Sequence, residues 1–320
     1  MTFNEYLSLR RIFVREYIGY SYFKDQYALQ LLQYQIEKKQ LRDGIKISDI
    51  KNGKLGFLTE KKPFKKLSAG SGNNRITHSD LKYFESDERL DFNISFRTWG
   101  DFKPHRKVEW RQTTRPGFSW VLQLNFDQMH DVSYHKLIKQ IEGHPFRYLS
   151  HPVCPNNRLT MAWARLDFDL DTGELLIEEI QNDWIREAHN LYKNLVKSQK
   201  KYKKRFENHW FFENTKADMP SFKKYLDEVL IDYKNIWDEA IMSAAIWFSV
   251  KELGISDIYI HTHEGGKLLK NCNPPRSLYS KLPRRFGFKK TDVAPVFIQN
   301  CHYLKKTLRK NKIEWWRLSF

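Results

Sequence analysis

Apolar and aromatic residues recur at three- and four-residue intervals over residues 2–42, the pattern of one buried helix face. The Asp-Gly pair that follows is a typical helix end. Residues 45–58 then predict a hairpin around an Asn-Gly turn, and the Gly- and Ser-rich run at 67–74 predicts a flexible linker. We therefore expect a helical, basic N-terminal region at 1–66, followed by a linker at 67–74.

Alternating apolar and polar positions predict strands after the linker, first within 90–115 and then at 119–127. Ser133 is the expected N-cap of a helix that runs to residue 142, because its hydroxyl can accept a hydrogen bond from a free backbone amide. The segments LTMAWARLDFDL and ELLIEEIQ predict two strands of a hairpin that turns at residues 171–173.

The register of this hairpin decides which charged side chains meet, and the sequence leaves two registers open. A two-residue turn places Asp167 opposite Glu178. A three-residue turn instead places Arg165 opposite Glu179, as an ion pair. Both glutamates therefore remain candidates for a functional role, while acids nearer the turn are also explained by a solvated sheet face.

The second half of the chain alternates helices and a strand. We expect a helix over 185–206, a helical insertion at about 189–234, a helix over 236–254 that ends at Gly254, and a strand at 257–262. Together with the earlier strands, this order predicts a mixed α/β core over 75–320.

Charge is distributed unevenly along the 320 residues. The formal net charge is +17, and residues 267–320 contain fourteen Lys or Arg against two acids. Aromatic residues lie among these cations, including Tyr279, Phe286, Phe288, Tyr303, Trp315 and Trp316. Cations with aromatic residues provide phosphate neutralisation and base stacking, so nucleic acid is the expected partner. The alternative is a solvated lysine-rich face.

The apolar runs, the cysteines and the first residues of the sequence indicate where the protein is expected to reside. No run of about 18 apolar residues occurs, so we expect no membrane partner. The three cysteines lack the paired spacing of a metal site, and the first residues lack an apolar signal segment. We expect a cytoplasmic protein.

An acidic and amide-rich strand end stands out against this basic background. Eight acids fall within residues 167–187, and the segment EEIQNDW places Glu178, Glu179, Gln181 and Asp183 at the end of a predicted strand. Ligands gather at the carboxyl ends of strands in open α/β sheets, and the segment HTHEGG follows another strand in the same way. We expect these two strand ends to form opposite walls of one site.

Three separated motifs carry a resemblance to known families. EEIQNDW, the unit WDEAIMSAAIWFSVKELGISDIYIHTHEGG and LYSKLP together resemble a domain of bacteriophage polyvalent proteins, over roughly residues 162–289. The order helix, strand, then a helix reading SLYSKLPRRFGF is also similar to the second half of the GNAT acyltransferase fold. The resemblance implies a GNAT-like central sheet flanked by helices, and a transferase of phage or anti-phage-defence type that acts on nucleic acid or a nucleic-acid-linked amine.

The resemblance also implies roles for individual residues. Tyr279 would serve the departing thiolate, and Glu178 or Glu179 would be the base, with Gln181 and Asp183 beside them. The residues expected to bind substrate or cofactor are Trp184, Arg186, His261, His263, Glu264, Lys267, Arg284 and Arg285. A coenzyme A thioester is the implied donor, but the chain departs from the family because residues 174–253 contain no glycine for a pyrophosphate loop.

Two further hypotheses use the same residues. A non-catalytic nucleic-acid-binding module needs only the basic surface. A magnesium-dependent nuclease would use Asp167 or Asp169 with Glu179 and Gln181, because carboxylates are the ligands that magnesium prefers. His261 and His263 share a strand face but lack a third ligand nearby, so we expect no metal site there.

Overall fold

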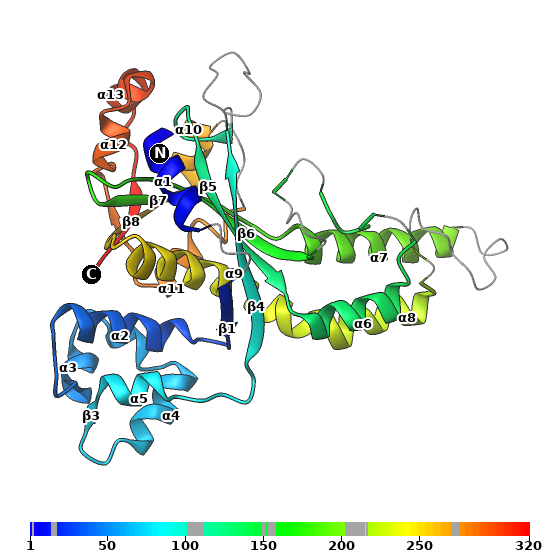
Figure 1. Cartoon of the computed structure of the whole chain (residues 1–320), viewed down its shortest axis with the longest axis horizontal. Helices are drawn as coiled ribbons and strands as arrows, with labels where there is room; N and C mark the ends of the chain where they lie inside the picture. Colours follow the sequence, from blue (N-terminus) through cyan, green and yellow to red (C-terminus); the bar gives the residue numbers. More distant parts are fainter. Residues whose placement is uncertain are drawn as a thin grey trace.

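The computed structural model describes residues 1, 3–13, 18–100, 112–141, 143–148, 151–152, 158–201, 215, 217–270 and 275–320. Within these ranges the chain is mixed α/β, with an eight-stranded sheet of order β1-β4-β5-β6-β7-β8-β10-β9 flanked by helices (Figure 1). The strands are β1 Ile18–Tyr22, β4 Leu90–Trp99, β5 Ser119–Phe126, β6 Thr160–Asp169, β7 Glu174–Gln181, β8 Asp257–His261, β9 Lys289–Thr291 and β10 Trp315–Ser319.

The strand pairs are antiparallel except β7 and β8, which are parallel. A parallel pair requires a long crossover, and its described residues include the helices α7 Asp183–Lys201, α8 Met219–Lys224 and α9 Leu230–Trp247. α9 continues into a π-helical turn, Phe248–Glu252, and Gly254 follows with a φ of +67°, as expected of a C-terminal glycine.

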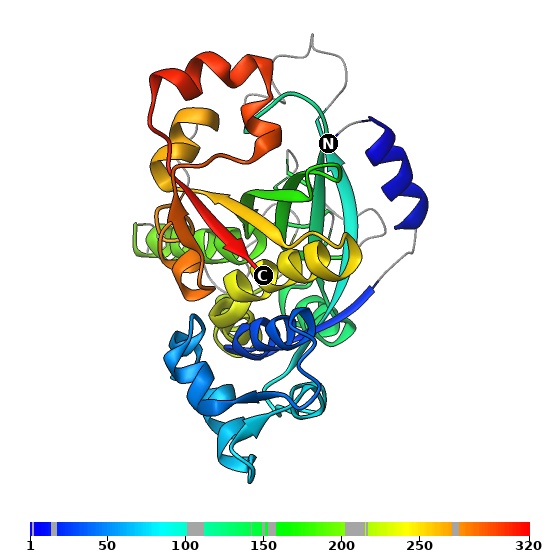
Figure 2. The ribbon, with the colours of Figure 1, turned by 90° about the vertical axis from the view of Figure 1, so that its left-hand side faces the viewer.

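The two faces of the sheet differ in polarity. α9 packs against one face of the sheet (Figure 2). That face carries Leu122, Ala164, Leu166 and Ile177, whose apolar side chains are fully buried. The opposite face carries charged and amide side chains from β5, β6 and β7 that are buried as well. Buried polar groups are costly without hydrogen bonds, so this second face is the place to look for a site.

The N-terminal region departs from the expected long helix and linker. It divides into α1 Phe3–Ile12, β1 and α2 Tyr27–Lys38, because β1 adds an edge strand beside β4. Residues 23–89, between these paired strands, hold a small helical module (the lower lobe of Figure 1). It contains α2, β2 Ile45–Lys46, α3 Ile47–Asn52, the 3₁₀ turn Gly56–Leu58, α4 Lys62–Gly70, β3 Arg75–Ile76 and α5 His78–Lys82.

Two sequence predictions in this module are wrong. The expected hairpin at 45–58 is one short strand followed by α3, and β2 pairs with the distant β3. The first half of the expected linker is the last turn of α4, which begins at Lys62 with Pro63 in its first turn and buries Phe64 in the core. Gly and Ser near a helix end resemble a linker in sequence because both also favour helix termini.

Helices α6 to α8 extend to the right of the sheet in Figure 1. α6 spans Gln128–Ile138 and begins earlier than expected, because the Asp127 carboxylate, and not Ser133, accepts the hydrogen bond from the His130 amide at 2.8 Å. The expected insertion at 189–234 mixes several elements, since α7 starts at Asp183 and α9 at Leu230. Residues 202–214 of that insertion lie outside the described part of the chain.

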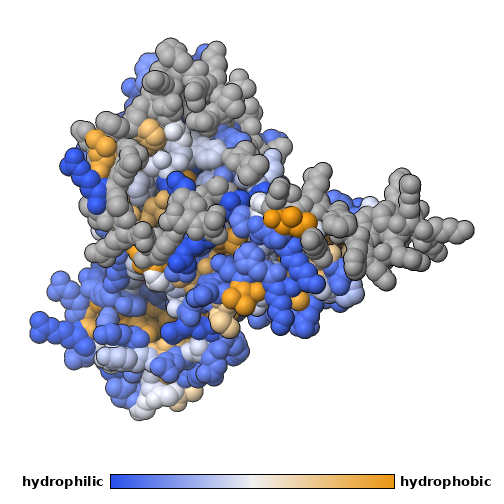
Figure 3. Space-filling view, turned by 45° about the vertical axis from the view of Figure 1, so that its right-hand side comes forward, coloured by the Kyte–Doolittle hydropathy of each residue, from blue (hydrophilic) through white to orange (hydrophobic). Residues whose placement is uncertain are grey.

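The last fifty residues build the other end of the sheet. They contain α11 Lys281–Arg285, β9, α12 Val296–Gln299, a 3₁₀ turn His302–Leu304, α13 Lys305–Lys310 and β10, preceded by α10 His263–Lys270. In the described ranges, no helix is both long enough and apolar enough to cross a bilayer. The face in Figure 3 is mainly hydrophilic, with hydrophobic residues in small separate patches.

Candidate functional site

A bulge in the central hairpin answers the register question. The loop between β6 and β7 has four residues, 170–173, which pairs Asp169 with Glu174 and Asp167 with Leu176. The register then shifts, so that Arg165 pairs with Glu179 and Glu178 becomes the extra residue of the bulge. Neither expected turn length is therefore correct, but the predicted pairing of Arg165 with Glu179 is confirmed.

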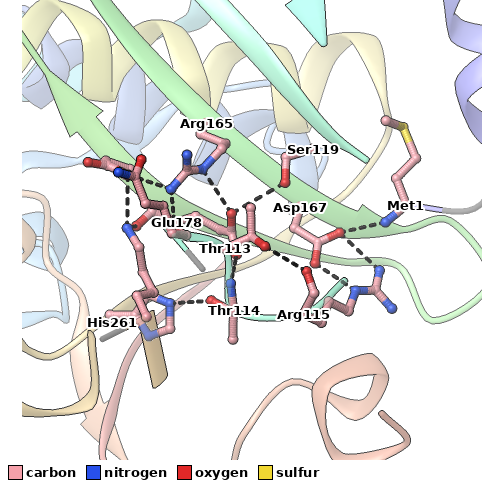
Figure 4. A network of polar contacts seen from close by, with 12 residues as sticks. Met1, Thr113, Thr114, Arg115, Ser119, Arg165, Asp167, Glu178 and His261 are labelled. Carbon is pink, nitrogen blue, oxygen red and sulfur yellow. Dashed lines mark hydrogen bonds and ion pairs between the residues drawn. The ribbon is translucent and has the colours of Figure 1, made fainter. Parts of the chain in front are cut away.

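The bulge brings both glutamates to the same buried arginine. Arg165 Nε donates to Glu178 Oε2 at 3.0 Å, and Arg165 Nη2 donates to Glu179 Oε2 at 2.5 Å. Arg165 and Glu178 are fully buried. Such an ion pair stabilises only when its remaining lone pairs are also satisfied, and Glu178 accepts further hydrogen bonds from the Thr114 amide and the Ser119 hydroxyl (Figure 4).

Glu179 has a second cationic partner from a distant element. Lys270, at the end of α10, is 1% exposed and places Nζ 3.0 Å from Glu179 Oε2. Gln181 also donates to Glu179 Oε1 at 2.5 Å. Burial alone would raise the pKa of Glu179, but the charges of Lys270 and Arg165 outweigh it and hold that pKa below its ordinary value. Glu179 is therefore an ion-paired carboxylate at neutral pH.

Two residues from the segments that follow β8 contact the bulge: Lys270 at the end of α10 and Tyr279 in the turn before α11. Lys270 Nζ and the Tyr279 hydroxyl both donate to the backbone carbonyl of Glu178, at 2.9 and 3.1 Å. That carbonyl is freed from the ladder by the bulge. Tyr279 is 3% exposed, so the residue expected to serve a thiolate contacts the strand itself.

His261 ends β8 on the same face and is fully buried. Its Nε2 lies 2.8 Å from the Thr114 hydroxyl, and its ring packs against Trp315 with centroids 4.8 Å apart. Burial lowers the pKa of His261 well below its ordinary value, and the charges of Lys270 and Arg165 lower it further. The imidazole is therefore neutral at pH 7, when one ring nitrogen is a donor and the other an acceptor.

Asp167 lies apart from the glutamates in its own ion pairs. Arg115 contacts both of its carboxylate oxygens, at 2.6 and 2.9 Å, and the Met1 amine lies 2.6 Å from Oδ1. Burial would raise the pKa of Asp167, but these two cations hold it below its ordinary value. Asp169 caps the hairpin loop, where its carboxylate accepts from the Thr172 amide at 2.9 Å. The carboxylates of the nuclease hypothesis are thus separated and already bonded.

Asp183 belongs to a second group at the start of α7. Its Oδ2 accepts from His151 Nδ1 at 2.8 Å and from the Trp163 indole at 3.0 Å, and its Oδ1 accepts from Arg186 at 2.6 Å. Burial would raise the pKa of Asp183, but the hydrogen bonds of His151 and Trp163 outweigh it and lower that pKa. A carboxylate that holds one histidine nitrogen leaves the other to accept a proton, which is the geometry of a general base.

At the start of α7, one backbone amide already donates a hydrogen bond to a side chain of the protein. The Asn182 side chain accepts from the Ile185 amide at 2.9 Å, as a helix cap does. Trp184 is 1% exposed and donates to the Tyr225 hydroxyl within an aromatic cluster. The turn expected to approach a pyrophosphate therefore presents a cap and a core residue.

The remaining predicted binding residues divide between surface and interior. Glu264 and Lys267 are exposed on α10, and His263 lies 3.6 Å from the Glu264 carboxylate. Arg284 is exposed over the Trp316 ring, at 5.5 Å. Arg285 is half-buried and bonds two acids of α9, so it joins α11 to that helix.

A basic surface lies at the sheet edge formed by β9, on β9, α13 and the segment before β10 (orange and red in Figures 1 and 2). It comprises seven exposed cations, Lys289, Lys290, Lys305, Lys306, Arg309, Lys310 and Lys312. Within the described chain, only Lys290 of these seven has an acidic partner, Glu314. A groove of about 720 Å³ joins this surface to α10 and is lined by Lys290, Lys310 and Lys312 among others.

The aromatic residues predicted to stack on bases are mostly in the core. Tyr279, Phe286, Phe288, Trp315 and Trp316 are each less than 5% exposed. Trp315 and Trp316 are buried because β10 is an interior strand between β8 and β9, and the residues on either side of α11 pack into the same hydrophobic core. Tyr303, at 66% exposure, is the member of the predicted set that faces solvent.

Sequence reasoning missed Lys270, Thr114 and His151 as members of these groups. Lys270 ends a basic helix, and nothing in the sequence marks it as buried. Thr114 and His151 lie in irregular segments whose position depends on tertiary contacts. Of the three, His151 is the residue that the sequence could have indicated, because it precedes a proline-rich loop and functional side chains are often found on loops.

No family model matches the chain, and neither a curated protein nor a solved structure is significantly similar to it. Across the described residues, no three His, Cys, Asp or Glu side chains are arranged to hold a metal ion.

Proposed function

We propose that the protein binds nucleic acid through the basic surface of β9, α13 and the segment before β10. The observation that carries the proposal is the concentration of exposed cations without acidic partners on these elements. Clustered like charges repel one another and concentrate counterions. A phosphate backbone neutralises them and releases those counterions, which is the main source of non-specific affinity for nucleic acid.

The arrangement on α13 suits a backbone rather than a base. Lys305 and Arg309 are four residues apart, as are Lys306 and Lys310, so the four side chains form two parallel rows on one helix side. Cations in each row are about 6 Å apart along the axis. Of the six aromatic residues predicted to stack on bases, Tyr303 is the one that faces solvent. With so few aromatic residues exposed to contact bases, phosphate contacts dominate the binding, and such contacts carry little sequence preference.

Fluorescence anisotropy with a short labelled single-stranded DNA tests the proposal. The variant Lys305→Ala, Lys306→Ala, Arg309→Ala removes three cations from α13, and we expect affinity to fall on the order of tenfold or more. The matched control removes three exposed lysines of the helical module, Lys46, Lys51 and Lys54, and so changes net charge equally. Equal losses in both variants would contradict a localised surface.

A transferase acting on a nucleic-acid-linked amine is the second candidate, and the observation in its favour is the Asp183–His151 pair. Both GNAT-expected bases, Glu178 and Glu179, are held by Arg165. In contrast, His151 Nε2 has no hydrogen-bond partner in the described chain and is the acceptor for an amine proton. The parallel strands β7 and β8 and the crossover helices support a GNAT-like sheet.

Mass spectrometry of nucleic acid incubated with the protein and an acyl-coenzyme A tests this candidate. A mass-shifted product that is lost in His151→Gln and reduced in Asp183→Asn supports it, because the aspartate only orients the imidazole. An unshifted product with the intact protein, or full activity of His151→Gln, would exclude His151 as the base.

A further inference from the structure

A cavity of about 340 Å³ lies where the helical module meets β1 and the end of α9. α2 of the module contacts α9 beside it, and Figures 1 and 2 both show α2 below α9. Ligand cavities are common at such boundaries and have volumes of about 300–1,000 Å³. The residues that line this cavity belong neither to the basic surface nor to the ion network around Arg165. It is therefore a candidate for a separate binding site.

Aromatic rings form much of the wall of this aromatic cavity. They are Tyr20, Phe23, Tyr34, Phe84 and Trp247. The ring centroids of Tyr20 in β1 and Trp247 in α9 are 6.2 Å apart, and those of Phe23 and Phe84 in the module are 5.7 Å apart. All five residues are buried or half-buried. Rings from both sides of the boundary therefore offer a stacking surface to a planar group.

Three glutamines add hydrogen-bonding groups to the same wall: Gln26, Gln30 and Gln33. Gln33 Nε2 donates to Glu37 Oε1 at 3.0 Å, which fixes the orientation of the Gln33 amide. Its Oε1 accepts no hydrogen bond from the described residues, and its Nε2 retains a second hydrogen. Nucleobases carry donors and acceptors on their edges that match such an amide, as N6 and N7 of adenine do.

The exposed part of the wall is cationic. Of the described residues that line the cavity, none is acidic, and the exposed ones are Lys82, Arg89 and Lys251. Lys251 is paired with Glu37, whereas Lys82 and Arg89 form no ion pair within the described ranges. A phosphate monoester carries a charge of about −1.5 to −2 at pH 7, which two unpaired cations can neutralise.

The acids that precede Arg89 in the chain line a different cavity. Asp87 and Glu88 belong to a neighbouring cavity of about 570 Å³ that also reaches Arg89, and Glu88 is paired with Lys62. The wall of the aromatic cavity therefore favours an anionic ligand.

A stacking surface inside and positive charge at the mouth suit a ligand that joins a planar heterocycle to a phosphate. We propose that the aromatic cavity binds one nucleotide, with its base among the rings and its phosphate near Lys82 and Arg89. A free nucleotide and an unpaired nucleotide of a strand both present these groups. A proline-rich peptide also docks in aromatic grooves, but it offers no anion to the two cations. This site is independent of the basic surface.

Isothermal titration calorimetry of the full chain with AMP, adenosine and ribose 5-phosphate separates the contributions of base and phosphate. We expect saturable binding of AMP at one site. Adenosine should bind about tenfold more weakly or worse, because it lacks the charged group. Ribose 5-phosphate should bind about fivefold more weakly or worse, because it lacks the stacked base. Absence of saturable AMP binding, or binding of either fragment as tight as that of AMP, would overturn the proposal.

Two double variants with the same change in charge test the location of the site. Lys82→Ala, Arg89→Ala removes both unpaired cations of the aromatic cavity, and we expect AMP affinity to fall about tenfold or more. Lys38→Ala, Arg42→Ala removes two exposed cations of the same module that do not line the cavity, and should leave AMP affinity unchanged. Thermal unfolding checks that both variants are folded. Equal losses in the two variants would overturn the proposal, as would binding of a polyproline peptide without binding of AMP.

Anisotropy with labelled single-stranded DNA distinguishes the two sources of the nucleotide. If the cavity takes a nucleotide of a strand, Lys82→Ala, Arg89→Ala should lower DNA affinity more than the control does. If it takes a free nucleotide, the two variants should bind DNA equally while their AMP affinities differ. The variant lacking Lys305, Lys306 and Arg309 should bind AMP like the natural chain. Loss of AMP binding in that variant would place the nucleotide on the basic surface and overturn the proposal.

Discussion

Replacing Arg165 by methionine tests whether the buried ion network holds the sheet together. Methionine keeps the apolar stem but removes the guanidinium, which leaves Glu178 fully buried with only the Thr114 amide and the Ser119 hydroxyl. Breaking a buried pair by removing one partner costs about 3–5 kcal/mol, because the other charge stays uncompensated. Since a domain is stable by about 5–15 kcal/mol, the loss is a large fraction of the total.

Urea denaturation followed by tryptophan fluorescence measures the free energy of unfolding. The control is Arg317→Met, because Arg317 is 41% exposed and pairs with Asp257 on the same sheet. Exposed pairs contribute about 0–1 kcal/mol, so the control should be nearly neutral. In a Glu178→Gln background the cost of Arg165→Met should shrink by about 0.5–3 kcal/mol. Equal destabilisation by the two arginine variants would show that the buried pair contributes no more to stability than the exposed pair.

The remaining predictions concern pH and backbone conformation. The pKa of Glu179 is lower in the folded state, so its ion pairs stabilise the fold fully above the ordinary pKa near 4.3, and this stabilisation is lost as pH falls through the lower folded value. Glu179→Gln should therefore have a smaller free energy of unfolding than the natural chain at pH 7, and the difference should narrow in acid. A difference that does not change with pH in urea titrations would disprove this. Gly44 and Gly173 both have positive φ, but a Cβ added at Gly44 would collide with the Ile76 carbonyl oxygen, whereas a Cβ added at Gly173 would meet nothing within 4 Å. We expect Gly173→Ala to cost about 1 kcal/mol and Gly44→Ala clearly more, and similar melting temperatures would contradict that difference.

Strong local patterns predicted the elements that build the sheet. Alternation identified β5 and both strands of the central hairpin, and Gly254 marked the end of the long crossover helix correctly. The same patterns misled where tertiary pairing decided the outcome. Ile18–Tyr22 continues a helix-like periodicity but forms an edge strand beside β4. There its backbone groups form hydrogen bonds with β4, and one face of the strand packs on the core.

The candidate site residues stay a prediction, but the structure shows where two of them lie. Glu178 at the end of β7 and His261 at the end of β8 both bond Thr114, through its amide and its hydroxyl. The contacts of Glu178 and Glu179 depend on a one-residue bulge, and the sequence does not show which residue of the strand forms that bulge. They also depend on Lys270, which contacts Glu179 from the distant helix α10. Register shifts and long-range ion pairs carry no local signature in a single sequence.

The dependence of nucleic-acid affinity on salt is the most direct test of binding through the basic surface. For single strands the slope of log affinity against log salt is about −0.7 for each neutralised phosphate. We expect a steep negative slope for the natural chain. The slope should be reduced in magnitude by about 2 in the variant lacking Lys305, Lys306 and Arg309, and unchanged in the variant lacking Lys46, Lys51 and Lys54. A flat slope, or the same reduction in both variants, would contradict binding through the basic surface.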